Sequence, residues 1–129
     1  MRSTASERAA RYDVSEQLRA ARDLLGQGRA GEAQLVVDAV LAACAQLPRE
    51  ALSGCCGVQA RLLALRGERV RAAMMAELAV WLARDGGPGR CQADAYLDQA
   101  CTLHALGDRD EARACLRRAR ELAPLDVPA

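Results

Sequence analysis

The residues able to carry out chemistry in this chain are few, and their spacing does not build an active site. His104 is the only histidine among the 129 residues, so a histidine base has a single candidate position. Cys101 precedes it by one helical turn, and i, i+3 neighbours on a helix can touch. Such a pair could supply a nucleophile and its base, but a lone histidine on a helix is far more often a surface or groove residue. We therefore expect no enzymatic activity.

The cysteines raise the question of redox or metal chemistry. Cys55 and Cys56 are adjacent, whereas redox and structural zinc sites use the Cys-x-x-Cys spacing. Most of the others fall in apolar helical patterns, where cysteine serves as a small hydrophobic residue. We expect no cofactor and no metal, with a cysteine-based redox or metal sensor as an alternative. The six cysteines are at positions 44, 55, 56, 91, 101 and 115.

Charge disfavours two further classes of partner. All 18 basic residues are arginine and 17 residues are acidic, so a net charge of +1 gives no field that favours nucleic acid or an anionic membrane. The arginines at 113–120 share their helix with Glu111 and Glu121, which favours a solvated, salt-bridged face. The loop at 86–89 lacks the Gly-Lys-Ser/Thr of a phosphate-binding loop.

The same composition bears on location. The N-terminus has no apolar run typical of a signal peptide, and no segment approaches the roughly 18 apolar residues of a membrane span. The absence of lysine beside abundant alanine, glycine and arginine is typical of a high-GC bacterial genome. We expect a bacterial, cytoplasmic protein.

Apolar residues recur with helical spacing along nearly the whole chain, and no segment alternates as a strand does. The pattern predicts six helices joined by short turns, hence an all-α domain. Two glycines, Gly54 and Gly57, weaken the third of these helices, predicted over 49–65, so we expect this helix to be kinked or loosely formed. The fourth helix is marked by the spacing of Val70, Met74, Leu78 and Trp81, and we expect Trp81 to pack against the last helix pair.

The polar residues 1–13 are expected to form an extension or a short extra helix. Asp13 and Glu16 resemble a capping box at the start of the first main helix. A similar pair, Asp108 and Glu111, is predicted to cap the sixth.

A turn glycine recurs at nearly constant intervals. Gly28, Gly67 and Gly107 are each followed five residues later by alanine, at Ala33, Ala72 and Ala112. Glycine permits a tight turn between helices, and alanine at the crossing lets the two helices approach closely. A recurring helix-turn-helix unit of this length indicates a repeat protein.

Residues 93–126 resemble a tetratricopeptide repeat, a helix pair of roughly 34 residues. Residues 14–47 and 53–86 resemble the unit more faintly, because Gln17 and Cys56 stand where the last unit has tyrosine. The resemblance implies a single domain over 14–126, with three antiparallel helix pairs stacked as a right-handed superhelix. It rests on Tyr96, Gly107, Ala112, Leu116, Ala119 and Pro124.

In this family a partner segment often lies in the concave groove made by the first helix of each pair. The Lys and Asn clamp that holds a partner's C-terminal carboxylate is absent here, and Asp94 and Asp98 would repel a carboxylate. The resemblance implies instead a groove for an apolar or amphipathic protein segment, although Leu18 and Leu65 could equally pack against neighbouring helices. The predicted groove residues are Leu18, Arg22, Leu25, Val58, Arg61, Leu65, Leu97, Cys101 and His104.

Repeat arrays usually end with an extra helix that covers the last pair, and no such helix is predicted here. Cys115, Leu116 and Leu122 are therefore expected to be partly uncovered, which favours self-association or a covering partner. We interpret the chain as a non-enzymatic protein-binding module, in size and architecture like the small chaperones or adaptors of type III secretion. A homo-oligomeric scaffold or regulatory module is the main alternative.

Overall fold

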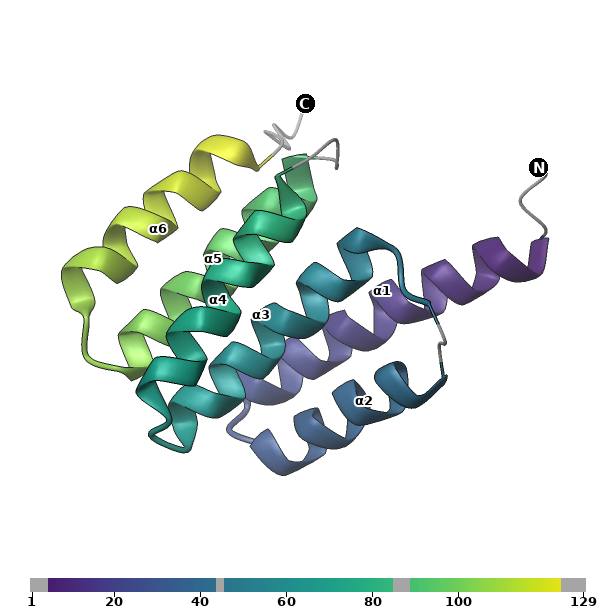
Figure 1. Ribbon diagram of the computed structural model, residues 1–129, viewed down its shortest axis with the longest axis horizontal. Helices are drawn as coiled ribbons and strands as arrows, with labels where there is room; N and C mark the ends of the chain where they lie inside the picture. The colour runs from purple at the N-terminus through teal and green to yellow at the C-terminus, as the bar shows by residue number, and fades with distance from the viewer. Residues whose placement is uncertain (1–4, 44–45, 85–88, 124–129) are drawn as a thin grey trace.

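The computed structural model describes residues 5–43, 46–84 and 89–123. This described part of the chain is helical and contains no strand, which confirms the all-α prediction. Figure 1 shows its helices, which are α1 (Ala5–Gly26), α2 (Ala30–Ala43), α3 (Arg49–Leu65), α4 (Arg69–Ala83), α5 (Gly89–Ala105) and α6 (Arg109–Leu122).

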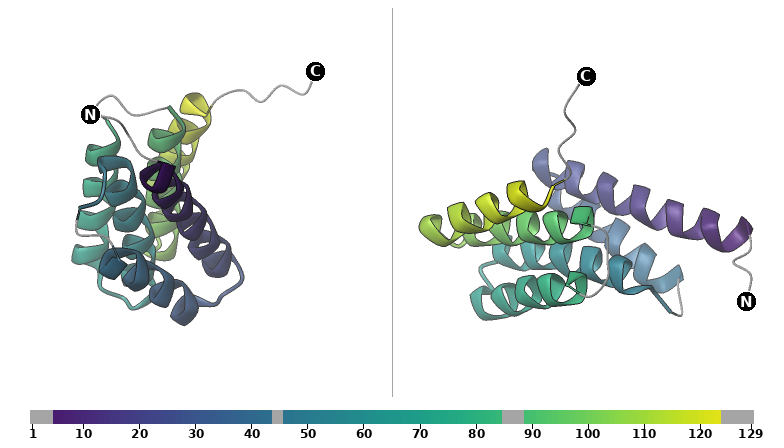
Figure 2. Two further views of the ribbon diagram at one scale, coloured as in Figure 1. Left: turned by 90° about the vertical axis from the view of Figure 1, so that its right-hand side faces the viewer. Right: turned by 90° about the horizontal axis from the view of Figure 1, so that it is seen from above.

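Helices that follow one another in the sequence pack as pairs, α1 with α2, α3 with α4 and α5 with α6. Helix α3 lies at the centre and also contacts α1, α2 and α5, while α4 contacts α5. The ribbon views show successive helices running in opposite directions (Figures 1 and 2). The backbone of α4 approaches neither that of α2 nor that of α6 closely, so the second helices of the pairs are spaced apart.

The three turn glycines adopt the same backbone conformation. Their φ angles are 77°, 79° and 88° at Gly28, Gly67 and Gly107, in the left-handed region that favours glycine. In the last turn, the amide of Asp108 donates to the carbonyl of Leu103 over 2.9 Å and that of Gly107 to His104 over 3.0 Å. These two bonds make a Schellman motif, and the other two turns repeat it. The repeat predicted from glycine spacing therefore exists in the backbone.

The core is built from small side chains. The alanine that follows each turn glycine, at Ala33, Ala72 and Ala112, is buried. Leucine and valine fill the wider spaces, with Val37 and Leu63 among the largest buried side chains. Such alanines let the helices of each pair approach closely.

Three local expectations need correction. Helix α1 begins at Ala5, so Asp13 and Glu16 lie inside the helix and do not start it. Asp108 stands at the N-cap of α6 without a side-chain cap bond, because its carboxylate accepts a hydrogen bond from Arg69. The third helix is continuous despite its glycines.

No helix in the described ranges has both the length and the apolar character to span a membrane.

Candidate functional site

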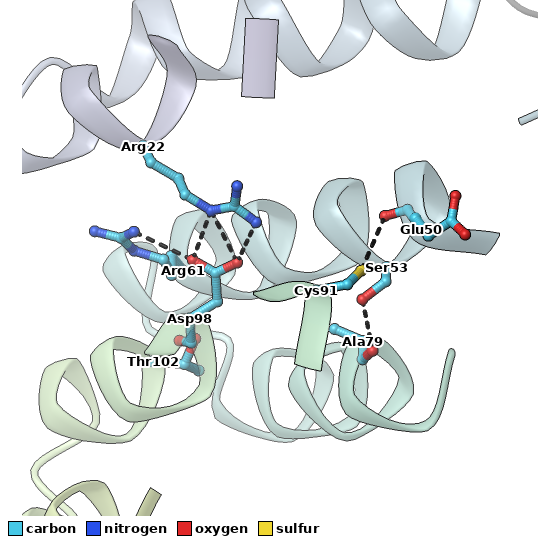
Figure 3. A network of polar contacts seen from close by, with 8 residues as sticks. All are labelled: Arg22, Glu50, Ser53, Arg61, Ala79, Cys91, Asp98 and Thr102. Carbon is cyan, nitrogen blue, oxygen red and sulfur yellow. Dashed lines mark hydrogen bonds and ion pairs between the residues drawn. The ribbon is translucent and has the colours of Figure 1, made fainter. Parts of the chain in front are cut away.

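A buried aspartate joins the first helices of all three pairs. The Asp98 side chain, on α5, is fully buried, and two arginines from other helices point at it (Figure 3). Arg22 of α1 donates to Asp98 Oδ2 from Nη2 over 2.9 Å and from Nε over 3.2 Å. Arg61 of α3 donates from Nη1 to Oδ1 over 3.3 Å. The backbones of α1 and α5 do not approach each other closely, and the Arg22 side chain spans the gap between them.

Two glycines of α3 make room for this arrangement. A Cβ atom at Gly57 would overlap Asp98 Oδ2 and lie 3.0 Å from the Asp98 Cβ and Cγ atoms. A Cβ atom at Gly54 would lie 2.6 Å from Leu18 Cδ1 of α1. The glycines therefore serve close helix packing, which outweighs their low helix propensity.

The repeat also explains the two arginines. Arg22 and Arg61 occupy the same position relative to Gly28 and Gly67, and they converge on one carboxylate in the third unit. The Thr102 hydroxyl donates to the Asp98 carbonyl over 2.8 Å, one turn back along α5. The carboxylate is thus held from two helices, α1 and α3, while Thr102 contacts only the backbone of Asp98.

Charge near Asp98 shifts two pKa values. Burial alone would lower the pKa of Arg22, but the Asp98 carboxylate raises it overall. The pKa of Asp94, one turn before Asp98, is raised by burial and by the charge of Asp98, against the opposing effect of Arg22. Both guanidinium groups thus face the fully buried carboxylate of Asp98, and the charge of Arg22 also acts on the half-buried Asp94.

This centre corrects the predicted groove. Leu18 and Val58 are core residues, with exposed fractions of 4% and 0%, so neither can line an open groove. Leu25 is half-buried against the same core. The side chains of Arg22 and Arg61 therefore occupy the space where an apolar groove was expected, and both pair with Asp98. This pairing was not predicted from the sequence.

The remaining predicted groove residues are more exposed than Leu18 and Val58. Leu65 and Leu97 are 60% and 40% exposed, His104 is exposed and Cys101 is half-buried. At the expected uncovered end, Cys115, Leu116 and Leu122 are all half-buried.

No disulfide joins the described cysteines, and the described residues hold no cluster of three or more metal-binding side chains. Cys91 lies 4.0 Å from the Glu50 carbonyl, beside the Ser53 hydroxyl, which donates to the Ala79 carbonyl over 2.7 Å (Figure 3). The pKa of Cys91 is raised by burial and by the nearby Glu50 and Asp94 carboxylates. A raised pKa lowers the thiolate fraction on which cysteine reactivity depends.

A second surface was not singled out from the sequence. Helix α4 faces its neighbours with Ala72, Ala76, Ala79 and Ala83, which are buried, and turns four of its large apolar residues outward. The exposed fractions of these outward residues, the α4 stripe, are Val70 71%, Met74 64%, Leu78 40% and Trp81 54%.

Trp81 does not belong to the core that joins α4 to α5, contrary to the expectation that it packs against the last pair. Its ring instead receives the Arg49 guanidinium 5.0 Å from the ring centroid. A cation over an indole face is a favourable contact that leaves much of the ring accessible.

Comparison of the repeat units shows that the fold does not require large apolar residues at the positions of the α4 stripe. The equivalent outward positions of α2 carry Gly31, Leu35, Ala39 and Ala42. Those of α6 carry Asp110, Ala114, Arg118 and Glu121. This comparison of equivalent positions is the signal by which the sequence could have revealed the stripe.

Scans against protein-family models, curated proteins and solved structures gave no significant match to this chain.

Proposed function

We propose that this chain is a non-enzymatic protein-interaction module of the tetratricopeptide type, and that it binds a partner segment through the α4 stripe. The observation that supports the proposal is the outward placement of Val70, Met74, Leu78 and Trp81 on one helix. Aromatic and methionine side chains are enriched at the centres of protein interfaces.

The chemistry of the stripe suits a partner better than solvent. Each large apolar side chain that becomes buried contributes about 1.5–3 kcal/mol, at roughly 25 cal/mol for each Å² removed from water. The indole of Trp81 can act as a rigid anchor, and Met74 can adapt to the shape of the opposing surface. Single exposed apolar residues are common on protein surfaces, but several on one helix face mark an interaction site.

The test compares two glutamate substitutions at equivalent repeat positions. Met74→Glu places a charge in the α4 stripe, whereas Leu35→Glu places one at the same position of α2, where the exposed fraction is 69%. A partner that co-purifies with the chain is isolated, and its affinity for each purified variant is measured by calorimetry. We expect Met74→Glu to weaken binding by about tenfold or more and Leu35→Glu to leave it near wild type.

Circular dichroism and thermal unfolding serve as the control for folding, since both side chains are exposed and should shift stability by no more than about 0.5 kcal/mol. Equal affinities for the two variants would show that the α4 stripe is not the binding surface.

The α4 stripe also favours a second candidate, a homo-oligomeric scaffold in which two copies cover each other's stripe. Sedimentation equilibrium distinguishes the two functions. A dimer that Met74→Glu dissociates would support the scaffold, and a monomer that binds its partner would support the module. For the partner-binding module, we propose from the size and architecture of the chain that the partner is a secretion subunit and that the chain is its chaperone.

A further inference from the structure

A groove separate from the α4 stripe opens between α4 and α6. It encloses about 410 Å³, within the range of sites that hold a ligand or the side chains of a peptide. Because the backbones of α4 and α6 lie apart, α5 forms its floor. The apolar part of the lining comes from Ala73, Ala76, Leu103, Leu106 and Ala114.

The repeat shows why this space is open. At the equivalent place between α2 and α4, Gln34 donates to Gln59 over 3.1 Å and accepts from Arg66 over 3.0 Å. In the next unit those positions of Gln34 and Arg66 are taken by Ala73 and Leu106. Gln99, which takes the position of Gln59, still lines the resulting groove, but Ala73 gives it an apolar wall and Leu106 a partly apolar floor.

The rim of the groove carries an excess of negative charge. Glu77, Asp108 and Glu111 line it together with one cation, Arg69. Arg69 is already engaged, because it donates to Asp108 over 3.2 Å and to the Leu106 carbonyl. Within the described residues Glu77 and Glu111 form no ion pair, so both carboxylates can bind a cationic side chain of a ligand.

We propose that this groove binds an amphipathic segment of a partner protein, with apolar side chains on the floor and Lys or Arg side chains facing Glu77 and Glu111. The apolar floor supplies contact area, and the carboxylates select a cationic segment over an anionic one. The site goes beyond the function proposed for the α4 stripe and does not depend on it, since its lining contains none of the four stripe residues.

The probe is a synthetic amphipathic helical peptide of leucine and lysine, about 14 residues long or roughly four turns. The matched peptide replaces every lysine by glutamate. Calorimetry on the full chain should show binding of the leucine-lysine peptide, at least about tenfold tighter than the leucine-glutamate peptide and weaker at higher salt.

Two kinds of variant locate the binding. Ala73→Gln copies Gln34 into the groove, where Gln99 occupies the position of Gln59, and should weaken binding about tenfold or more. The double variant Glu77→Gln/Glu111→Gln should weaken binding and remove most of the preference for the lysine peptide. The control, Asp110→Asn, removes an exposed carboxylate of α6 that does not line the groove.

Thermal unfolding shows whether each variant folds. If Ala73→Gln fails to fold, the double variant still tests the proposal, because Glu77 and Glu111 are exposed. Equal binding of the two peptides, or a double variant that binds as the control does, would overturn the proposal. A dimer that both kinds of variant dissociate would assign the groove to a second copy of the chain and overturn it as well. Met74→Glu is expected to leave peptide binding largely intact, which separates failure here from failure at the α4 stripe.

Discussion

Replacement of Gly57 by alanine should destabilise the protein, although alanine is the better helix former. The new methyl group would overlap Asp98 Oδ2 and lie 3.0 Å from the Asp98 Cβ and Cγ atoms. Asp98 cannot simply turn away, because Arg22 and Arg61 hold both of its carboxylate oxygens. The substitution must either separate α5 from α3 or break the ion pairs.

The magnitude follows from three opposing terms. Alanine in place of a helical glycine contributes about 1 kcal/mol of stability. Overpacking costs about 1–3 kcal/mol, and each lost hydrogen bond to a charged group costs about 1.5–3 kcal/mol. We expect a net loss of about 2 kcal/mol for Gly57→Ala. At Gly54 the methyl group would meet the movable end of Leu18, so Gly54→Ala should stay within about 1 kcal/mol of wild type.

Urea unfolding followed by circular dichroism measures both variants. A double-mutant cycle then assigns the cause, because Gly57→Ala should be neutral or stabilising once Asp98→Ala has removed the carboxylate. If Gly57→Ala proves as stable as Gly54→Ala, the close approach of Asp98 to α3 is not as described. If its cost persists without Asp98, the loss arises elsewhere.

Two further predictions concern titrating groups. The pKa of Asp94 is raised above its ordinary value of 3.8, so the folded state binds more protons than the unfolded state between pH 3.8 and the folded pKa. This group therefore lowers stability as pH rises through that range. Asp94→Asn should therefore melt at a higher temperature than wild type at neutral pH, and the difference should vanish below pH 3.8; a difference independent of pH would point to another cause. Burial raises the pKa values of Cys56, Cys91 and Cys115, so iodoacetamide should label them more slowly in the folded chain than in urea, with rates that climb with pH. Rapid labelling of the folded chain at neutral pH would instead favour the redox alternative.

The helix pairs were predictable from the sequence because their signals are local. A glycine in the left-handed region and an alanine at the crossing specify each turn without reference to distant residues, as at Gly107 and Ala112. The helical spacing of apolar residues is equally local.

The faces of the helices were less predictable, because size misleads. In α4 the larger residues such as Met74 look like core, yet closely packed helices accommodate alanines such as Ala76 and leave the larger side chains outside. The partners of Asp98 were also missed. Arg22 is 76 residues away in sequence, and no local pattern pairs the two.

The contact between Arg22 and Asp98 should make unfolding of the three helix pairs more cooperative. In an ideal repeat array each unit touches only its neighbours, so that units can fray from the ends one at a time. Here the first unit holds the third directly and bypasses the second. Such a next-nearest-neighbour link opposes stepwise fraying, because loss of either terminal unit leaves part of a charged cluster without its counter-charge. Truncation to two units would therefore remove more stability than the lost unit and its one interface supply, and the three pairs should unfold as one body.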